Sequence, residues 1–243
     1  MRLLFALPLA LYLSGVLSAQ SERSELWWTL EQYSQTYGYS RDQADLKTVL
    51  IEGQLIQGGQ AYEFTLRKRR PDSIRYTLAR LEHSITIGFD GVEGWQRITT
   101  GDKVQVRTLN KQEVAMLTEE ADFEGPLLRH LRNFSDRIHL RGNERVDGEL
   151  ARIVEIDQRD GSKRRYFLSE SRNLVLRCEL LNAAGACLLQ TNYRDYRWIE
   201  TFPFAFEVEN RVDAQLISTV KVERVQVNKD QGLLSIYFKK PRG

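Results

Sequence analysis

The side chains that most often carry out chemistry are few in this chain, and they form no known catalytic pattern. The three histidines, His83, His130 and His139, lie far apart, and none belongs to a His-Glu-x-x-His metal motif. The chain also has no Gly-x-Ser-x-Gly elbow for a nucleophilic serine and no glycine-rich phosphate loop. The sequence therefore predicts neither an enzyme nor a bound metal or other cofactor.

The carboxylates are abundant, but two prominent ones have a simpler explanation than catalysis. Asp90 and Asp160 each precede a glycine, which is the dipeptide that a tight turn requires for its backbone geometry. We therefore interpret both as turn residues.

Cys178 and Cys187 are the only cysteines, and they flank a predicted turn at residues 182–185. A hairpin would place them either directly opposite each other, which allows a disulfide, or on a diagonal, which leaves the Cα atoms too far apart. An oxidising compartment favours the bridge, so we expect a disulfide while both registers stay open. Two cysteines without a nearby histidine do not predict a zinc site.

The first nineteen residues have the organisation of an export signal. Arg2 gives a positive start, residues 3–13 are almost wholly apolar, and Ser18 and Ala19 are small residues suited to cleavage. The apolar run is too short for a bilayer span. Because no cysteine for lipid attachment follows the small residues, we expect residues 1–19 to be a signal peptide and the mature chain to be soluble in the periplasm.

Charge and length narrow the remaining classes. Without the leader, 34 basic residues stand against 33 acidic ones, a formal charge of +1. A nearly neutral chain gives no reason to expect a nucleic-acid partner. No linker rich in Ser, Gly or Pro interrupts the sequence, so residues 20–243 are expected to form one domain and a monomer.

Alternation of apolar and polar residues predicts strands through most of the mature chain, after a helix at residues 24–37. Gly58-Gly59 joins the first two strands as a tight hairpin. Short turns between neighbours imply an antiparallel sheet, and so many strands should make it curl. The predicted strands are 49–57, 60–68, 73–81, 83–89, one that begins near Trp95, 104–108, 137–141, 150–157, 162–168, 173–181, 187–198, 204–211, 215–227 and 233–238.

One segment, residues 110–134, changes to helical spacing and is broken by Gly125-Pro126. We interpret it as a helical lid over the sheet, with a static helical plug as the alternative. The lid residues are Leu117, Phe123, Leu127, Leu128 and Leu131.

Several stretches together resemble a known family, the outer membrane lipoprotein-sorting proteins of the LolA and LolB type. The resemblance covers most of the mature chain and rests on order and spacing. Its segments are 53–69, RPDSIRY at 70–76, GFDGVEGW at 88–95, YFL at 166–168, LVLR at 174–177, YRDY at 193–196, Phe202-Pro203, and a closing strand that ends at Phe238 before Pro241. It implies a mainly antiparallel β fold, a curved incomplete barrel or half-barrel with an N-terminal helix and a helical lid insertion, whose concave face holds acyl chains.

Burial of hydrocarbon is sufficient for such a site, because each methylene moved out of water contributes about 0.8 kcal/mol. Alternation gives the candidate cavity residues, and a closed apolar core remains the alternative reading of the same face. These residues are Val49, Ile51, Leu55, Tyr62, Phe64, Leu66, Ile74, Tyr76, Leu78, Ile85, Ile87, Phe89 and Trp95, with Val104 and Val106 extending the same face.

Three basic runs, at residues 67–70, 163–165 and 239–240, lie at predicted strand ends. They would meet lipid phosphates if they lined a rim, but charged strand ends that prevent aggregation are the commoner case.

Two functions remain open at this point. The first is a carrier that takes lipoprotein acyl chains or lipid toward the outer membrane. The second is a lipid-sensing protein of the same fold that contacts an inner- or outer-membrane protein partner.

Overall fold

The structure is a computed structural model, and it describes residues 23–37, 46–121, 123, 127–128, 137–229 and 238–241. The predicted signal peptide, His130, the lid residue Leu131 and most of the predicted strand 233–238 lie outside this part of the chain. Within it, no helix has the length and apolar character needed to cross a bilayer.

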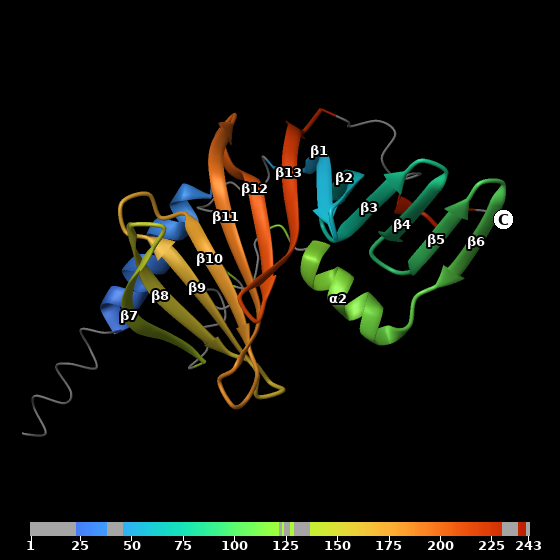
Figure 1. The fold of residues 1–243 in the computed structure, drawn as a ribbon. Coiled ribbons are helices and arrows are strands. Elements are labelled where there is room, and N and C mark those ends of the chain that lie inside the picture. The colour runs from blue at the N-terminus through green and yellow to red at the C-terminus, as the bar shows by residue number, and fades with distance from the viewer. Residues whose placement is uncertain are drawn as a thin grey trace, which may run out of the picture.

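Thirteen antiparallel strands form one sheet that curves without closing, as the sequence predicts (Figure 1). Their order is β6-β5-β4-β3-β2-β1-β13-β12-β11-β10-β9-β8-β7. The strands are β1 Thr48–Gln57, β2 Gln60–Arg69, β3 Ser73–Arg80, β4 His83–Phe89, β5 Gly94–Thr100, β6 Lys103–Thr108, β7 Ile138–Val146, β8 Glu149–Asp157, β9 Lys163–Ser169, β10 Val175–Leu181, β11 Cys187–Ile199, β12 Phe202–Val212 and β13 Gln215–Val227.

Most predicted strands are present, and apart from β7 their bounds lie within two residues of the prediction. The largest difference is in β7, which continues to Val146 although alternation in the sequence stops near Arg141. A bulge explains the loss of pattern, because the register between β7 and β8 shifts between Leu140 and Asn143, and Gly142 has a φ of +86°.

The centre of the sheet joins two meanders, β1–β6 and β7–β13, through the pairing of β1 with β13. A bulge at Gly53 brings β13 so close that a Cβ there would lie 2.1 Å from the carbonyl oxygen of Lys221. At the end of this ladder the Asn228 side-chain oxygen accepts hydrogen bonds from the backbone amides of Lys47 and Thr48, at 2.7 and 3.2 Å. The pairing therefore depends on a residue without a side chain at position 53.

Cross-strand register places the apolar residues of the first meander on one face, because paired residues of antiparallel strands point to the same side. Ile51 pairs with Leu66, and Leu66 pairs with Tyr76. Tyr76 pairs in turn with Ile87. We call this side of the sheet the inner face.

The inner face continues across the second meander. Leu55 pairs with Val220 and Val220 with Val208. Val208 then pairs with Tyr193, which belongs to the apolar cluster that packs against the N-terminal helix. One continuous apolar face therefore extends over both halves of the sheet.

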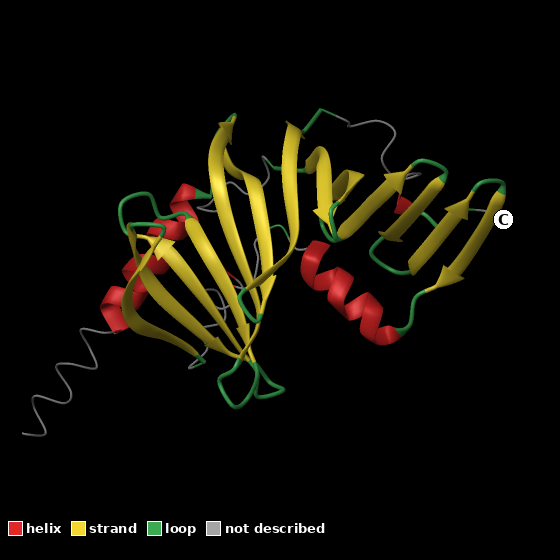
Figure 2. Ribbon diagram, in the orientation of Figure 1, coloured by secondary structure: helices red, strands yellow, loops and turns green. Residues whose placement is uncertain are grey.

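Two helices cover separate parts of this face (Figure 2). The first, residues 23–36, buries Leu30 and Tyr33 against Val154 and Tyr166 on β8 and β9. The second, α2 (Lys111–Ala121), packs Leu117 and its neighbours against the first meander. Each half of the sheet therefore has a helical cover of its own.

The N-terminus of α2 is fixed by a capping box. The side chain of Asn110 accepts hydrogen bonds from the amides of Gln112 and Glu113, while the Glu113 carboxylate accepts one from the amide of Asn110. Arg107 at the end of β6 donates to both oxygens of the same carboxylate. The cap thus sets both the start and the direction of the helix.

The outer face of the first meander holds the C-terminal segment. The indole nitrogen of Trp95 donates a hydrogen bond of 2.7 Å to the carbonyl oxygen of Phe238. The Phe238 side chain is completely buried, with the Arg69 guanidinium 5.4 Å from its ring centre. Nearby, Lys240 donates hydrogen bonds to Thr108 and Glu93.

Trp95 fits against the sheet because its neighbour across the strand is Gly88. A Cβ at position 88 would lie 2.5 Å from the indole ring, and Trp95 is only 1% exposed. We expect Gly88→Ala to lower the free energy of unfolding by about 2 kcal/mol, because the ring has no room to retreat. Urea denaturation measures this loss.

The control is Ser84→Ala, on the same strand and the same face, which should change stability by less than about 0.5 kcal/mol. Equal stability of the two variants would show that the Trp95 ring is free to move.

Candidate functional site

The candidate lining residues of β1–β4 all lie on the inner face, arranged in rows across the strands. One row joins Ile74 to Phe89 and Gly94. The next joins Ile51, Leu66, Tyr76 and Ile87. A third row consists of Phe64, Leu78, Ile85 and Ile98, which are paired in register across β2–β5. We call this third row the open row.

Helix α2 covers the first of these rows and leaves the open row in contact with solvent. Ile74 and Phe89 are 1% and 4% exposed and pack against Leu117 and Ala121 of the helix. Ile85 and Ile98, in contrast, are 39% and 36% exposed. The cover therefore stops partway along the strands.

The other members of the predicted set show the same division. Val49 is buried, Leu66, Tyr76 and Ile87 pack at the border of the cluster under α2, and Leu55 and Tyr62 are only half-buried. Leu55 and Tyr62 are paired with each other and lie on the side of the open row away from α2. Exposure on the inner face thus increases toward the end of the strands that carries the Gly58-Gly59 hairpin.

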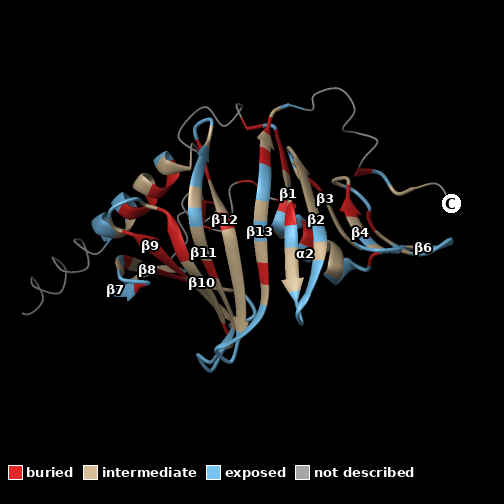
Figure 3. Ribbon diagram, turned by 45° about the horizontal axis from the view of Figure 1, so that its top comes forward, coloured by how far each residue is buried: buried red, intermediate tan, exposed pale blue. Residues whose placement is uncertain are grey.

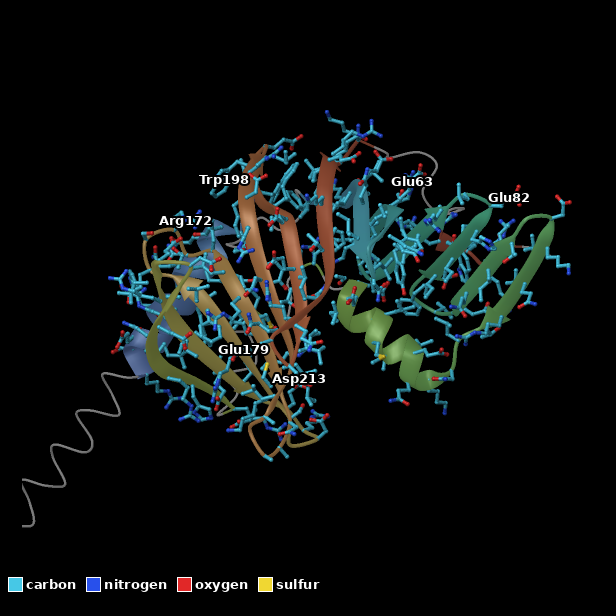
Figure 4. The ribbon with its side chains drawn as sticks, viewed as in Figure 1. Glu63, Glu82, Arg172, Glu179, Trp198 and Asp213 are labelled. Carbon is cyan, nitrogen blue, oxygen red and sulfur yellow. The ribbon has the colours of Figure 1, made fainter. Side chains whose placement is uncertain are left out.

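A polar row follows directly after the open row. Arg80 pairs with His83, His83 with Thr100 and Thr100 with Lys103, so all four side chains lie on the inner face. The His83 Nδ1 and the Thr100 hydroxyl are 3.3 Å apart. The turn beyond this row contains Glu82, labelled in Figure 4. The inner face therefore changes from apolar to polar within one residue pair.

Trp95, Val104 and Val106 do not belong to this face. Trp95 pairs with Gly88 and Thr108, and Val104 and Val106 pair with Thr99 and Arg97, all on the outer side. Their predicted position on the lining face is wrong, because the hairpin after β4 pairs Phe89 with Gly94 and thereby turns the next residue outward.

The described lid residues are buried, and they belong to different apolar clusters. Leu117 lies in the cluster under α2 and Phe123 in the central cluster with Val49 and Val225. Leu127 and Leu128 join the cluster beneath the N-terminal helix. Such burial is what a closed lid and a fixed plug have in common, so the lid remains a prediction.

The basic run at residues 67–70 does not project freely from a strand end. The Lys68 ammonium and the Arg70 guanidinium lie 4.9 and 5.1 Å from the centre of the Phe123 ring. Arg69, on the opposite face, lies against Phe238. These three charges hold two distant chain segments against the sheet, which neither the rim nor the charged-edge interpretation anticipated.

The predicted disulfide is absent. Cys178 pairs with Thr191, whereas Cys187 pairs with Leu181, and both thiols are free. Three residues along a strand correspond to roughly 10 Å, beyond the Cα separation that a disulfide spans. Burial raises the pKa of the Cys178 thiol to about 11, so this group is largely unreactive at neutral pH.

The outer face of β7–β9 carries the one buried carboxylate of the described residues, Glu155. Its oxygens accept hydrogen bonds from Arg141, Lys163 and Arg165, at 2.7 to 3.1 Å. Burial raises the pKa of Glu155, but the hydrogen bonds from Arg165 and Lys163 and the charge of Arg141 outweigh it and set the pKa at about 2. A carboxylate bound on every side in this way has a structural role.

The potential metal ligands are scattered over the described part of the chain. In the ranges described above, no group of three or more His, Cys, Asp or Glu side chains is placed to hold a metal ion. His139 lies 3.0 Å from Asp157 on the outer face, and His83 lies in the polar row. The open row, in contrast, offers a surface for apolar contact.

Comparison with solved structures identifies the fold. A DUF1329 family protein from Desulfovibrio piger aligns over 89% of this chain and 96% of its own, with a TM-score of 0.62 and 12% identity. A structure described as an outer membrane lipoprotein-sorting protein domain, from Vibrio parahaemolyticus, aligns over 86% and 95%, with a TM-score of 0.57 and 13% identity.

The LolA superfamily protein NE2245 from Nitrosomonas europaea aligns over 86% of this chain and 97% of its own, with a TM-score of 0.54 and 15% identity. The chain therefore has a LolA-like fold. No protein-family model and no curated protein sequence matches it.

The Glu155 cluster makes the stability of the fold depend on pH. A folded pKa of about 2 lies below the ordinary value of 4.5, so the stabilisation is complete above pH 4.5 and is lost as the pH falls toward 2. Because its three partners are each at least a third exposed, screening limits the effect to about 1–2 kcal/mol.

We therefore expect Glu155→Gln to be less stable than the wild type at pH 7 and to lose less stability between pH 5 and pH 3. Urea denaturation at both pH values measures the difference. Parallel loss in wild type and variant would show that other groups control the acid sensitivity.

Proposed function

We propose that this protein is a periplasmic carrier that holds the acyl chains of a lipoprotein or lipid on its inner face for transfer toward the outer membrane. The observation that carries the proposal is the open row, because Phe64, Leu78, Ile85 and Ile98 form an aligned apolar strip that the helices leave partly exposed. A contiguous apolar surface that stays in contact with water favours a binding role.

The polar row supports the same proposal. Hydrocarbon laid along the open row would lie one residue pair away from Arg80, His83 and Lys103. A ligand with an acyl chain and a polar head matches that change in character over the same short distance. A purely structural core would gain nothing from an exposed edge of this kind.

The energetics of binding need no catalyst. Each methylene buried against the row contributes about 0.8 kcal/mol, so a long acyl chain offsets the cost of its own ordering. The one buried carboxylate of the described residues, Glu155, is on the outer face and already has three basic partners. A binding role without chemistry is therefore the function that this arrangement supports best.

The test is the affinity of the protein for a fluorescent fatty acid. Ile85→Asn places a polar amide in the middle of the open row, and we expect it to weaken binding about tenfold, since the amide loses hydration beside the chain. Stability should fall by less than about 1 kcal/mol, because Ile85 is 39% exposed. Fluorescence titration and urea denaturation measure the two effects.

The matched control is Leu188→Asn, which removes an apolar side chain that is 48% exposed from β11, away from the open row. Its affinity should equal that of the wild type. The same loss in both variants, or in neither, would rule out the open row as the binding surface.

A further inference from the structure

The two edges of the sheet differ in how they meet solvent. The β7 edge is interrupted by the bulge at Gly142, which breaks its ladder and prevents regular addition of another strand. β6 pairs with β5 at every position from Trp95–Thr108 to Thr100–Lys103 without a bulge. Most of its residues are exposed, as Figure 3 shows.

The hydrogen bonds that β6 has to offer can be assigned from its pairing. The Leu109 amide donates to the Gly94 carbonyl oxygen at 2.8 Å, which makes Leu109–Gly94 a hydrogen-bonded pair. Alternation along the ladder then turns the backbone groups of Gln105 toward β5 and those of Val104 and Val106 away from it. In the described part of the chain, no strand pairs with β6 on the side away from β5.

The charged residues of β6 do little to prevent another strand from pairing with this edge. Arg107 is bound to Gln96 and to Glu113 of α2, so its side chain is held over the inner face. Lys103 stands at the first position of the strand, beside the turn. Between these two residues the edge presents only Val104, Gln105 and Val106.

The open row leads directly to this edge, because Ile98, its last member, pairs with Gln105. In a strand added beside β6, the residue opposite Gln105 would be in a non-hydrogen-bonded pair, with Cα atoms about 4.5 Å apart and its side chain on the inner face. A chain attached to that side chain would pass over Gln105 onto Ile98 and Ile85. The β6 edge therefore suits a polypeptide segment, and the open row suits a hydrocarbon chain attached to that segment.

We propose that β6 binds an extended polypeptide segment of an acylated cargo as an added strand. This inference rests on the proposed function, because it takes the open row as the site of the acyl chain. Main-chain hydrogen bonds with Val104 and Val106 supply affinity that is independent of peptide sequence. The attached hydrocarbon supplies the remainder and fixes the position of the segment.

The test compares two probes, palmitic acid and a short peptide with a palmitoyl group on a central lysine side chain. In Val106→Pro the proline removes an outward amide and obstructs an added strand, while no bond to β5 is lost. We expect the variant to bind the peptide about tenfold more weakly than the wild type, because several main-chain hydrogen bonds are lost together. Its affinity for palmitic acid should not change.

Val106→Thr keeps the amide and is the matched control, which should bind both probes as the wild type does. If Val106→Pro fails to fold, the wild type is titrated with the palmitoyl peptide N-methylated at alternate residues, which should bind about tenfold more weakly than the unmethylated peptide.

Equal affinity of the wild type for palmitic acid and for the palmitoyl peptide would overturn the inference and leave the proposed function standing. Binding of neither probe would remove both. A concentration-dependent dimer that Val106→Pro abolishes would assign the edge to a second copy of the chain, and so would also overturn the inference.

Discussion

The pairing of β1 with β13 is the constraint on which the rest of this structure depends. It joins a meander from the first half of the chain to one from the second half, and it brings their apolar sides onto the same face. Gly53 allows the close approach, and Asn228 closes the end of the ladder. Without this junction each meander would expose an edge and half of an apolar surface to water.

One part of the inner face is closed core and another part is a candidate binding surface, and the length of α2 separates the two. The helix has eleven residues and contacts the sheet through Val114, Leu117 and Ala121. It seals Ile74 and Phe89, which form a closed core, but the strands continue beyond it into the open row. The boundary between protein interior and candidate binding surface is therefore set by where a short helix begins and ends, and its capping box fixes the first of these points.

Much of this arrangement could be predicted from the sequence, because alternation in a strand is a local signal. The twelve candidate lining residues from Val49 to Phe89 fall on one face, as their spacing predicts. Trp95 was misplaced because the face of a strand depends on how many residues the preceding turn leaves unpaired, and periodicity does not record that number. The predicted disulfide between Cys178 and Cys187 was wrong for a similar reason, because the register of two paired strands decides which residues lie opposite each other.

Long-range contacts set the other limit. Nothing near residues 67–70 indicates that Lys68 and Arg70 lie against Phe123, or that Arg69 lies against Phe238. A run of charged residues predicts a solvated surface as long as its distant aromatic partner is unknown. The open row was likewise visible as part of an apolar face, but its exposure depends on the reach of α2, which the spacing of Leu117 alone does not give.

The central junction also has a consequence for biogenesis. Lys47 and its partner Asn228 are separated by 181 positions, so almost the entire polypeptide must be available before β1 acquires its second neighbour. Until then, β1 of the first meander keeps unpaired backbone groups along one side. Pairing between strands so far apart in the sequence slows folding. Until β13 pairs with β1, this open edge is available for pairing with another chain.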